Sequence, residues 1–392
     1  MSETQSKAPA ANGGGTGDGP SGSAPPAGEE SVSTLRRVIN TVGVDNLSLI
    51  LALIGLVLVI FWLQPLFLGW QNLMNSLSQS IVIVGLLAIG ETVVIVGGML
   101  DISVGSIASV ASVTAATAII LGSISLPFGD IEIPIPFAQG SMQAGILVGI
   151  ATGVTLGIIN GLVVTKLRVN PIIATLGTLA AFAGLAFLVA PTGKPVGVVT
   201  QPDFTWLATG RLFAEAPLPD LGGRAWTGIP ILFLIFTLVA ILFHVLMKYT
   251  DFGRAVYAIG GNATAARLAG INLTRMKIGM YILSGATAGL AGVLLTARTT
   301  SGNPINGVGF ELQAITAVFL GGAATTGGKG TIVGTVLAVL LVGVLNNGMN
   351  LLGVNTFYQK VALGVLLIAA VALSQWRQAR SERARTRTAA AG

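Results

Sequence analysis

The chain has 392 residues, of which 53% are hydrophobic and only 9% are charged, and it contains no cysteine. Because soluble domains carry about 25% charged residues, this composition excludes an ordinary soluble protein, and the lack of cysteine excludes disulfide and thiol chemistry. The formal net charge of +6 does not indicate a nucleic-acid partner, since five arginines cluster after the last apolar segment, where they predict a cytoplasmic C-terminus.

The first segment, residues 1 to about 30, is rich in glycine, serine, alanine and proline and cannot bury a hydrophobic core. We expect residues 1–44 to form a disordered cytoplasmic tail, residues 45–376 a transmembrane domain in the lipid bilayer, and residues 377–392 a basic cytoplasmic tail. No apolar core follows a basic start, so the first segment does not resemble a cleaved signal peptide.

Ten apolar segments follow in chain order, and they predict an all-α membrane protein with about ten transmembrane helices. A helix needs about 20 mostly apolar residues to cross a bilayer, and the eighth segment is too short to cross unaided. The predicted spans are 47–64, 76–97, 103–122, 143–165, 172–190, 229–247, 276–297, 311–323, 331–348 and 357–375.

The charged residues between these segments test the predicted topology. With the N-terminus inside, ten crossings place Lys166, Arg168 and the basic segment 248–277 on the cytoplasmic side, together with the C-terminal arginines. The acidic loop near residue 130 and the long loop 191–228 then fall outside. Basic loops are enriched on the cytoplasmic side of membranes, so the sequence predicts that both termini are cytoplasmic.

Two glycine-rich breaks, at 97–105 and 321–330, interrupt the apolar pattern. Each consists of an apolar run, a glycine pair, a charged residue and a further glycine before the next apolar run. Corresponding breaks in the two halves of a chain are typical of internal repeats with a substrate path between them. Two ordinary glycine-rich connections would show the same pattern, so both interpretations stay open.

Several polar residues in or near the spans are candidates for a translocation path or gate. Acids inside a bilayer cost several kcal/mol unless they are paired or hydrated, which makes them functional candidates; capping of the next helix is the alternative for Asp101. For the asparagines, hydrogen bonds between helices or helix termination are alternatives to substrate contact. The candidates are Glu91, Asp101, Ser103, Asn160, Glu311, Asn346 and Asn347.

The segment 248–277 is a polar island with five basic residues and one acid. Residues 260–262, with the sequence Gly-Gly-Asn, predict a turn, and residues 263–269 predict a short helix closed by Gly270. The helix is either a solvated connector or a docking helix whose Arg267 contacts a carboxylate of a partner.

The glycine-rich stretch around Lys329 does not form a phosphate-binding loop. Gly330 follows the lysine where such loops carry Ser or Thr, and Ala323 replaces the first glycine. The chain therefore shows no nucleotide site and no cofactor site, and any ATP hydrolysis has to come from another polypeptide.

Five motifs in order, covering about residues 45–375, resemble the permeases of ribose-type ABC transporters. Several motifs in the same order are far more specific than any single one. They are LDISVGS at 100–106, IATLG at 173–177, YAIGGN at 257–262 with ARLAGIN at 266–272, GGKGTIVGT at 327–335 and LNNGMNLLGV at 345–354.

The resemblance implies a non-catalytic, multi-pass permease subunit of a bacterial inner-membrane importer for a monosaccharide or related small polyol. A periplasmic sugar-binding protein would deliver the substrate, a cytoplasmic ABC ATPase would use ATP and Mg, and a second permease protomer would complete a homodimer or heterodimer. Residues 253–271 would be the coupling loop that rests on the ATPase. The coupling residues are Gly253, Arg254, Gly260, Gly261, Asn262, Ala266, Arg267, Leu268, Gly270 and Ile271.

The chain departs from the family pattern at two places. Ala263 and Thr264 stand where the family often has an acid, and the segment 181–184 lacks the arginine that the family tends to carry. With only 6% aromatic residues, we expect no tight sugar site in the membrane and place specificity in the binding protein. An ion-coupled secondary transporter and an ABC permease for branched-chain amino acids are the alternative functions.

Overall fold

The computed structural model describes residues 44–125, 132–216, 219–221 and 226–391. The predicted tail over residues 1–44 and the acidic loop near residue 130 lie outside the described residues, apart from Val44 and the end of that loop from residue 132. In the described part, nine helices are long and apolar enough to cross a membrane. The eighth predicted span is α12 (Phe310–Leu320), an 11-residue helix, as its short apolar run predicted.

The long helices match the predicted spans closely. The π-helical turn η2 (Asn72–Leu77) continues directly into α3, so that together they form one rod. The long helices of the described residues are α2 (Val44–Leu63), α3 (Ser78–Val96), α4 (Val104–Leu121), α5 (Met142–Thr165), α6 (Pro171–Val189), α8 (Ile231–Tyr249), α11 (Leu273–Thr299), α13 (Ile332–Leu351) and α14 (Thr356–Ala391).

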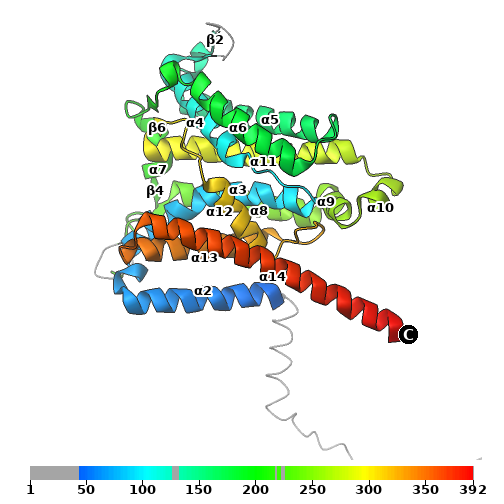
Figure 1. Ribbon diagram of the computed structural model, residues 1–392. Helices are drawn as coiled ribbons and strands as arrows, with labels where there is room; N and C mark the ends of the chain where they lie inside the picture. Colours follow the sequence, from blue (N-terminus) through cyan, green and yellow to red (C-terminus); the bar gives the residue numbers. More distant parts are fainter. Residues whose placement is uncertain (1–43, 126–131, 217–218, 222–225, 392) are drawn as a thin grey trace, which may run out of the picture. The chain divides into compact units, whose positions relative to one another are not determined.

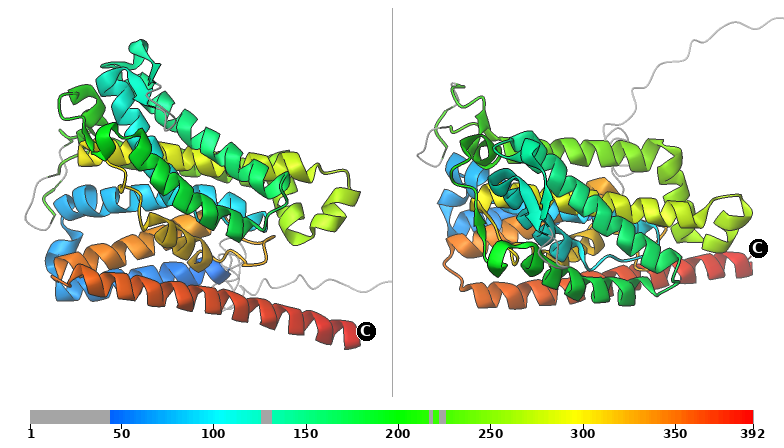
Figure 2. Two further views of the ribbon diagram at one scale, coloured as in Figure 1. Left: turned by 45° about the horizontal axis from the view of Figure 1, so that its top comes forward. Right: turned by 90° about the horizontal axis from the view of Figure 1, so that it is seen from above.

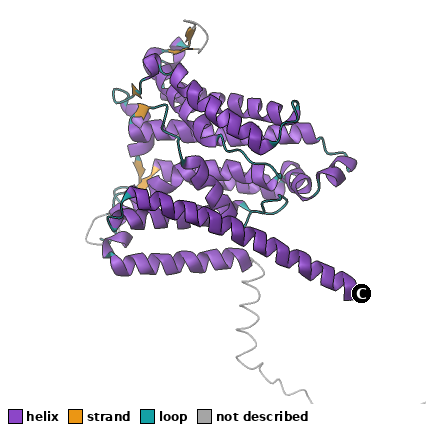
Figure 3. Ribbon diagram, in the orientation of Figure 1, coloured by secondary structure: helices purple, strands orange, loops and turns teal. Residues whose placement is uncertain are grey.

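Short elements connect the long helices. The short helices are η1 (Pro65–Leu68), η3 (Pro136–Ala138), η4 (Pro191–Gly193), α7 (Pro202–Thr209), α9 (Asp251–Gly261) and α10 (Ala263–Leu268). Three antiparallel pairs of strands are β1 (Ser123–Ser125) with β2 (Glu132–Pro134), β3 (Val196–Gly197) with β6 (Ser301–Gly302), and β4 (Arg211–Leu212) with β5 (Ile229–Pro230). Helix therefore makes up almost all of the ordered framework (Figure 3).

Burial separates a central group of helices from a peripheral group. Helices α3 and α4 are apolar on all sides, and nearly every residue of both is buried. By contrast α2, α8 and α14 expose large apolar side chains such as Leu58, Leu238 and Ile368. Helices that are apolar all round belong in a protein core or in contact with lipid, so the first group forms the core and the second is suited to a bilayer.

Helices α5 and α11 pack backbone against backbone through glycines. A Cβ atom added to Gly153 would lie 2.7 Å from Gly289 Cα, and one added to Gly157 would collide with the carbonyl of Tyr281. Small residues allow this close approach in membrane proteins. The contact holds α11 directly against α5, and the two helices lie close together in both views of Figure 2.

The long helices run in broadly similar directions, and the two ends of the bundle differ (Figure 1). One end carries α9 and α10, and the basic end of α14 extends past it. The other end carries β4, β6 and α7. Helix α14 continues without a break through the predicted basic tail to Ala391. The two ends are named below the coupling end and the strand end.

Candidate functional site

Helices α9 and α10 form a short helical knob at the coupling end. The Thr250 side chain accepts a hydrogen bond from Gly253 N at the start of α9, and the Asn262 side chain accepts one from Ala265 N, 3.0 Å away, at the start of α10. The prediction of a Gly-Gly-Asn turn was wrong, because Gly260 and Gly261 complete the last turn of α9. Asn262 alone makes the bend, with an extended backbone and a capping side chain.

The predicted short helix is confirmed as α10, and it ends before Gly270, which has a φ of 86°. Within α10, the Ala266 side chain is buried. Ile271 N donates a hydrogen bond to Ala266 O across 3.0 Å, which closes the end of the helix. Arg267 is exposed and Leu268 is 84% exposed. The knob therefore presents a charged and an apolar side chain next to each other on its surface.

The two glycine-rich breaks meet each other and the end of α9 at one point, here called the glycine junction. Gly328 N donates to Val96 O across 2.8 Å, which joins the second break to the end of α3. A Cβ atom on Gly327 would lie 2.6 Å from Gly98 Cα, and one on Gly260 would lie 2.5 Å from Gly328 N. Three stretches of backbone are therefore in direct contact, with no side chain between them.

The side chain of Tyr257 also connects α9 to the second break. Its hydroxyl donates a hydrogen bond of 2.7 Å to Gly330 O. Burial raises the pKa of the Tyr257 phenol above its usual value, so the group keeps its proton and stays a donor. Helix α9 is thus held to the break both by backbone contact and by this side chain.

A buried polar network lies next to the junction, around Asp101. Glu91 Oε1 accepts a hydrogen bond from Asp101 N across 3.0 Å. Asp101 Oδ1 accepts from Ser103 N at 3.1 Å and from Ser103 Oγ at 2.6 Å, and Asp101 Oδ2 accepts from Ser284 Oγ at 3.2 Å. Asn160 Nδ2 donates to Asp101 Oδ1 at 3.3 Å and to Ser103 Oγ at 2.7 Å. All five residues have no exposed surface.

This network gives Asp101 and Asn160 structural roles, while their part in a path or gate stays a prediction. Ser103 is the N-cap position of α4, and Asp101 accepts a hydrogen bond from its backbone N–H. The Asp101 carboxylate also holds α5 through Asn160 and α11 through Ser284. Asn160 makes bonds between helices, as one of its alternatives predicted. Within the described residues, Glu91 Oε2 and Asn160 Oδ1 have no hydrogen-bond partner, and the one ion pair joins Arg254 to Asp251.

The remaining predicted path residues lie apart from the network. Both carboxylate oxygens of Glu311 accept from Gly309 N, at 3.1 and 3.0 Å, and the side chain lies against Gly105 at the start of α4. Asn347 exchanges two amide hydrogen bonds with Asn72, at 2.8 and 2.9 Å. Asn346, the neighbouring residue, instead lines a cavity near the strand end.

The sequence did not single out several of the residues that complete these groups. Ser284 gave no signal, because serine is enriched in membrane helices, and Asn72 lies before the predicted span 76–97. Arg298 lies in the last turn of α11 and lines the same cavity as Asn346. A lone arginine within a long apolar segment is a signal that could have identified it.

Known proteins were compared with this chain. A family model described as "Branched-chain amino acid transport system / permease component" matches residues 72–371. The chain is 40% identical over 352 residues to the ribose import permease protein of Bacillus subtilis (strain 168), which covers 89% of this chain and 99% of that protein. No solved structure matches the chain significantly.

Two relatives from Escherichia coli (strain K12) are almost as similar. The ribose import permease protein is 36% identical over 332 residues, which covers 84% of this chain and 93% of that protein. The L-arabinose transport system permease protein is 36% identical over 305 residues, which covers 78% of this chain and 83% of that protein. Similarity to the curated relatives thus extends over most of both chains.

Proposed function

The chain belongs to the family of transport-system permease components that includes the ribose and L-arabinose import permeases, and we propose that it forms the membrane path for a monosaccharide or related small polyol. As a member of this family it is the non-catalytic, multi-pass membrane component of an ABC importer. The similarity to ribose and L-arabinose permeases supports the proposed substrate. The glycine junction, which connects the exposed knob α9–α10 to both glycine-rich breaks, supports the proposed coupling.

The knob is the proposed contact with a cytoplasmic ABC ATPase that uses ATP and Mg. Leu268 would insert into an apolar groove of the ATPase, and Arg267 would pair with a carboxylate at its edge. The basic segment 248–277 supports a cytoplasmic position for this end. Both chain termini would then be cytoplasmic, in the inner membrane of a bacterium.

The junction gives a physical route for coupling. A side chain between two elements can change rotamer and absorb a small displacement, but backbone in contact with backbone cannot. A shift of α9 therefore moves the end of α3 and the second break together. Through Asp101, the first break also pulls on α5 and α11, so one movement at the ATPase would change the packing of several spans.

Two further partners complete the proposed transporter. A periplasmic sugar-binding protein would dock at the strand end, and a second permease protomer, identical or related, would provide the other half of the path. The exposed apolar faces of α2, α8 and α14 leave ample surface for lipid and for this protomer.

The proposal is tested with the complete transporter in liposomes, comparing the variants Gly260→Ala and Gly261→Ala. A methyl group on Gly260 collides with Val96 O, whereas one on Gly261 meets no atom within 4 Å. We expect Gly260→Ala to lose sugar-stimulated ATP hydrolysis at least about tenfold, and Gly261→Ala to keep it. Equal activity of the two variants would contradict the coupling route.

The transported substrate and the energy source are tested in the same liposomes. D-ribose, L-arabinose and L-leucine are offered in turn, with and without ATP. Accumulation of a sugar that depends on ATP supports the proposal. Accumulation of L-leucine alone, or uptake driven by an ion gradient without ATP, would refute it.

A further inference from the structure

A cavity of about 150 Å³ near the strand end lies between α3, α11, α12 and α13, away from the glycine junction. Its polar lining consists of Ser80, Arg298, Gln313 and Asn346, and the ring of Phe310 provides an aromatic wall. Four different helices contribute these groups. Side chains of this kind converging from separate helices in a largely apolar bundle are typical of a small-molecule site.

The polar groups of this cavity keep hydrogen-bonding capacity for a ligand. Gln313 and Asn346 are half-buried, and neither side chain makes a hydrogen bond within the described part of the chain. Ser80 Oγ donates to Leu77 O across 2.8 Å and can still accept a hydrogen bond. Arg298 Nη1 donates to Gln79 O across 3.0 Å, which leaves other guanidinium donors unused. A half-buried amide without a partner loses hydrogen-bond energy unless water or a ligand supplies one, so these side chains are placed to bind something polar.

The chemistry of the lining favours a neutral polyol. Amide, guanidinium and hydroxyl groups together donate to and accept from sugar hydroxyls, and an aromatic face such as that of Phe310 packs against the C–H face of a sugar ring. An amino acid could place its carboxylate on Arg298. Its ammonium group would then have no carboxylate to pair with, because none of the described residues that line the cavity is an acid.

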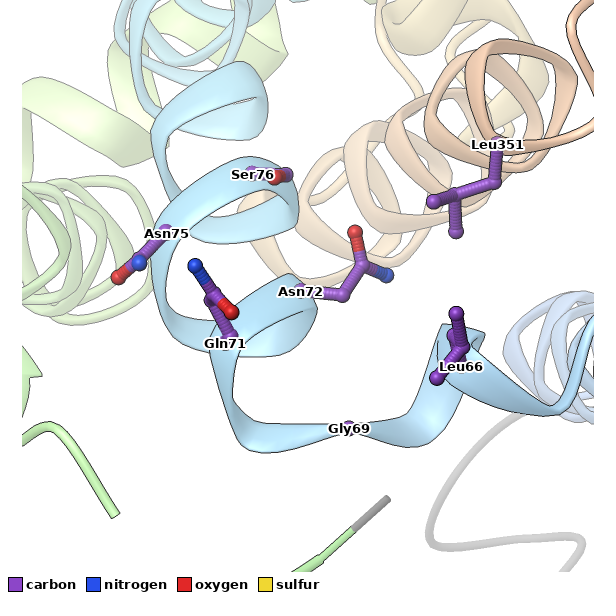
Figure 4. A pocket seen from close by; sticks show the side chains of 7 residues that line it. All are labelled: Leu66, Gly69, Gln71, Asn72, Asn75, Ser76 and Leu351. Carbon is purple, nitrogen blue, oxygen red and sulfur yellow. The ribbon is translucent and has the colours of Figure 1, made fainter. Parts of the chain in front are cut away.

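A second cavity, of about 220 Å³, lies at the start of the same rod, around the π-helical turn η2. Figure 4 shows Gln71, Asn72, Asn75 and Ser76 around this turn, with Leu351 of α13 opposite. The reciprocal pair of Asn72 and Asn347 ties the turn to α13. Single π-turns inside helices occur frequently at functional sites.

The two cavities follow one face of the rod. Asn72, Ser76 and Ser80 are spaced four residues apart, which places them on one side of a helix. Asn72 and Ser76 line the η2 cavity, and Ser80 lines the cavity that contains Arg298 and Asn346. A solute that leaves the η2 cavity along this face therefore meets hydroxyl and amide groups on its way to Arg298 and Asn346.

We propose that the cavity of Ser80, Arg298, Gln313 and Asn346 is a subsite for the hydroxyl groups of a neutral monosaccharide, and that the η2 cavity is its outer mouth. The inference rests on the proposed function, and it adds a substrate contact within the membrane path. It departs from the expectation that specificity lies only in the binding protein. The path takes part in selection through these four side chains.

The test uses the complete transporter in liposomes, with saturating sugar-loaded binding protein and either D-ribose or L-arabinose. The variants are Asn346→Leu and Gln313→Leu. The matched control is Asn350→Leu, one turn further along α13, which removes a hydrogen bond from Gln359 Nε2 at an exposed position outside the cavity. Uptake should fall about five- to tenfold in each cavity variant, because a lost hydrogen bond is worth about 1 kcal/mol. ATP hydrolysis should stay within about twofold of the control.

Each outcome decides between the alternatives. Unchanged uptake in both cavity variants would overturn the subsite while the wild-type transporter still imports sugar. A parallel loss of uptake and ATP hydrolysis would also overturn it, since that result indicates a structural defect. If Asn346→Leu does not assemble, Gln313→Leu is read in the same way. Failure of the wild type to import either sugar would refute the proposed function instead.

Discussion

Replacement of Asp101 by alanine tests whether the buried network holds the bundle together. The carboxylate accepts hydrogen bonds from three side-chain donors, on Ser103, Asn160 and Ser284, in addition to the backbone bond from Ser103 N. These three residues have no exposed surface. Asp101→Ala leaves them without this acceptor. Asn160 keeps its bond to Ser103 Oγ, and a serine hydroxyl can rotate towards a backbone carbonyl, so only part of each bond is lost.

The magnitude follows from the three donors. Side-chain hydrogen bonds between membrane helices are worth about 0.6 kcal/mol on average and about 1.7 at most, and a buried donor left unpaired costs about 1–3 kcal/mol. Three partly compensated donors therefore predict a loss of about 2–4 kcal/mol. Asp101→Asn keeps one acceptor oxygen and the shape of the side chain, so its loss should be about 1 kcal/mol.

The assay is reversible unfolding of the purified chain in mixed detergent micelles, followed by the loss of helical circular dichroism. Asp251→Ala is the control, because its ion pair with Arg254 is exposed and such pairs contribute about 0–1 kcal/mol. A free energy of unfolding for Asp101→Ala that equals that of the control would refute the reasoning, and so would a larger loss in Asp101→Asn than in Asp101→Ala.

Three other substitutions have definite expected outcomes. Arg267→Glu should leave membrane insertion intact but lower sugar-stimulated ATP hydrolysis at least about tenfold; normal stimulation would exclude α10 as the docking helix. Gly153→Ala should cost about 1–3 kcal/mol in the unfolding assay, because overpacking forces backbones apart, whereas Gly177→Ala, with no atom within 4 Å, should cost nothing. Tyr257→Phe should cost about 1 kcal/mol through its lost bond to Gly330 O. The raised pKa means that wild type loses stability only as the pH rises beyond the usual tyrosine value of 10.0, and the variant should lack this alkaline loss.

The helices were predictable because hydrophobicity over about 20 residues is a local signal. The predicted spans agree with the long helices, and the short α12 was recognised by its length. Local signals failed at Gly260 and Gly261, where glycines suggested a turn. In the structure both glycines are helical. Gly260 is needed there because α3 and the second break approach it too closely for any side chain, whereas Gly261 has room for one. Such a contact between distant segments leaves no trace in the local pattern.

The functional groups show the same limit. Glu91, Asp101 and Asn160 were identified as candidates because polar groups are rare in spans, yet the sequence could not show that they form one network with Ser284. The cavity near the strand end depends on residues from four helices. Only Asn346 had been singled out, because Gln313, Ser80 and Arg298 gain their meaning from packing and not from spacing along the chain.

One helical rod connects the two candidate sites. Residues Asn72–Val96 form 25 helical residues, about 37 Å at 1.5 Å per residue. The carbonyl oxygen of Val96, the last residue of the rod, contacts Gly260 and Gly328 at the glycine junction. Ser80, near the start of the rod, lines the proposed sugar subsite. Helix α11 runs likewise from the knob, where Asn272 caps it, to Arg298 at the cavity.

A rigid rod held at one end by the ATPase contact would move the cavity wall at its other end. Because the chain has no cysteine, spin labels can be attached at Ser76→Cys and Val308→Cys, both exposed positions near the cavities. In a transporter with one labelled protomer, we expect the distance between the labels to differ between the nucleotide-free and ATP-bound states. Identical distance distributions in both states would mean that the rods do not transmit the coupling movement, and the opening of the cavity would need another route.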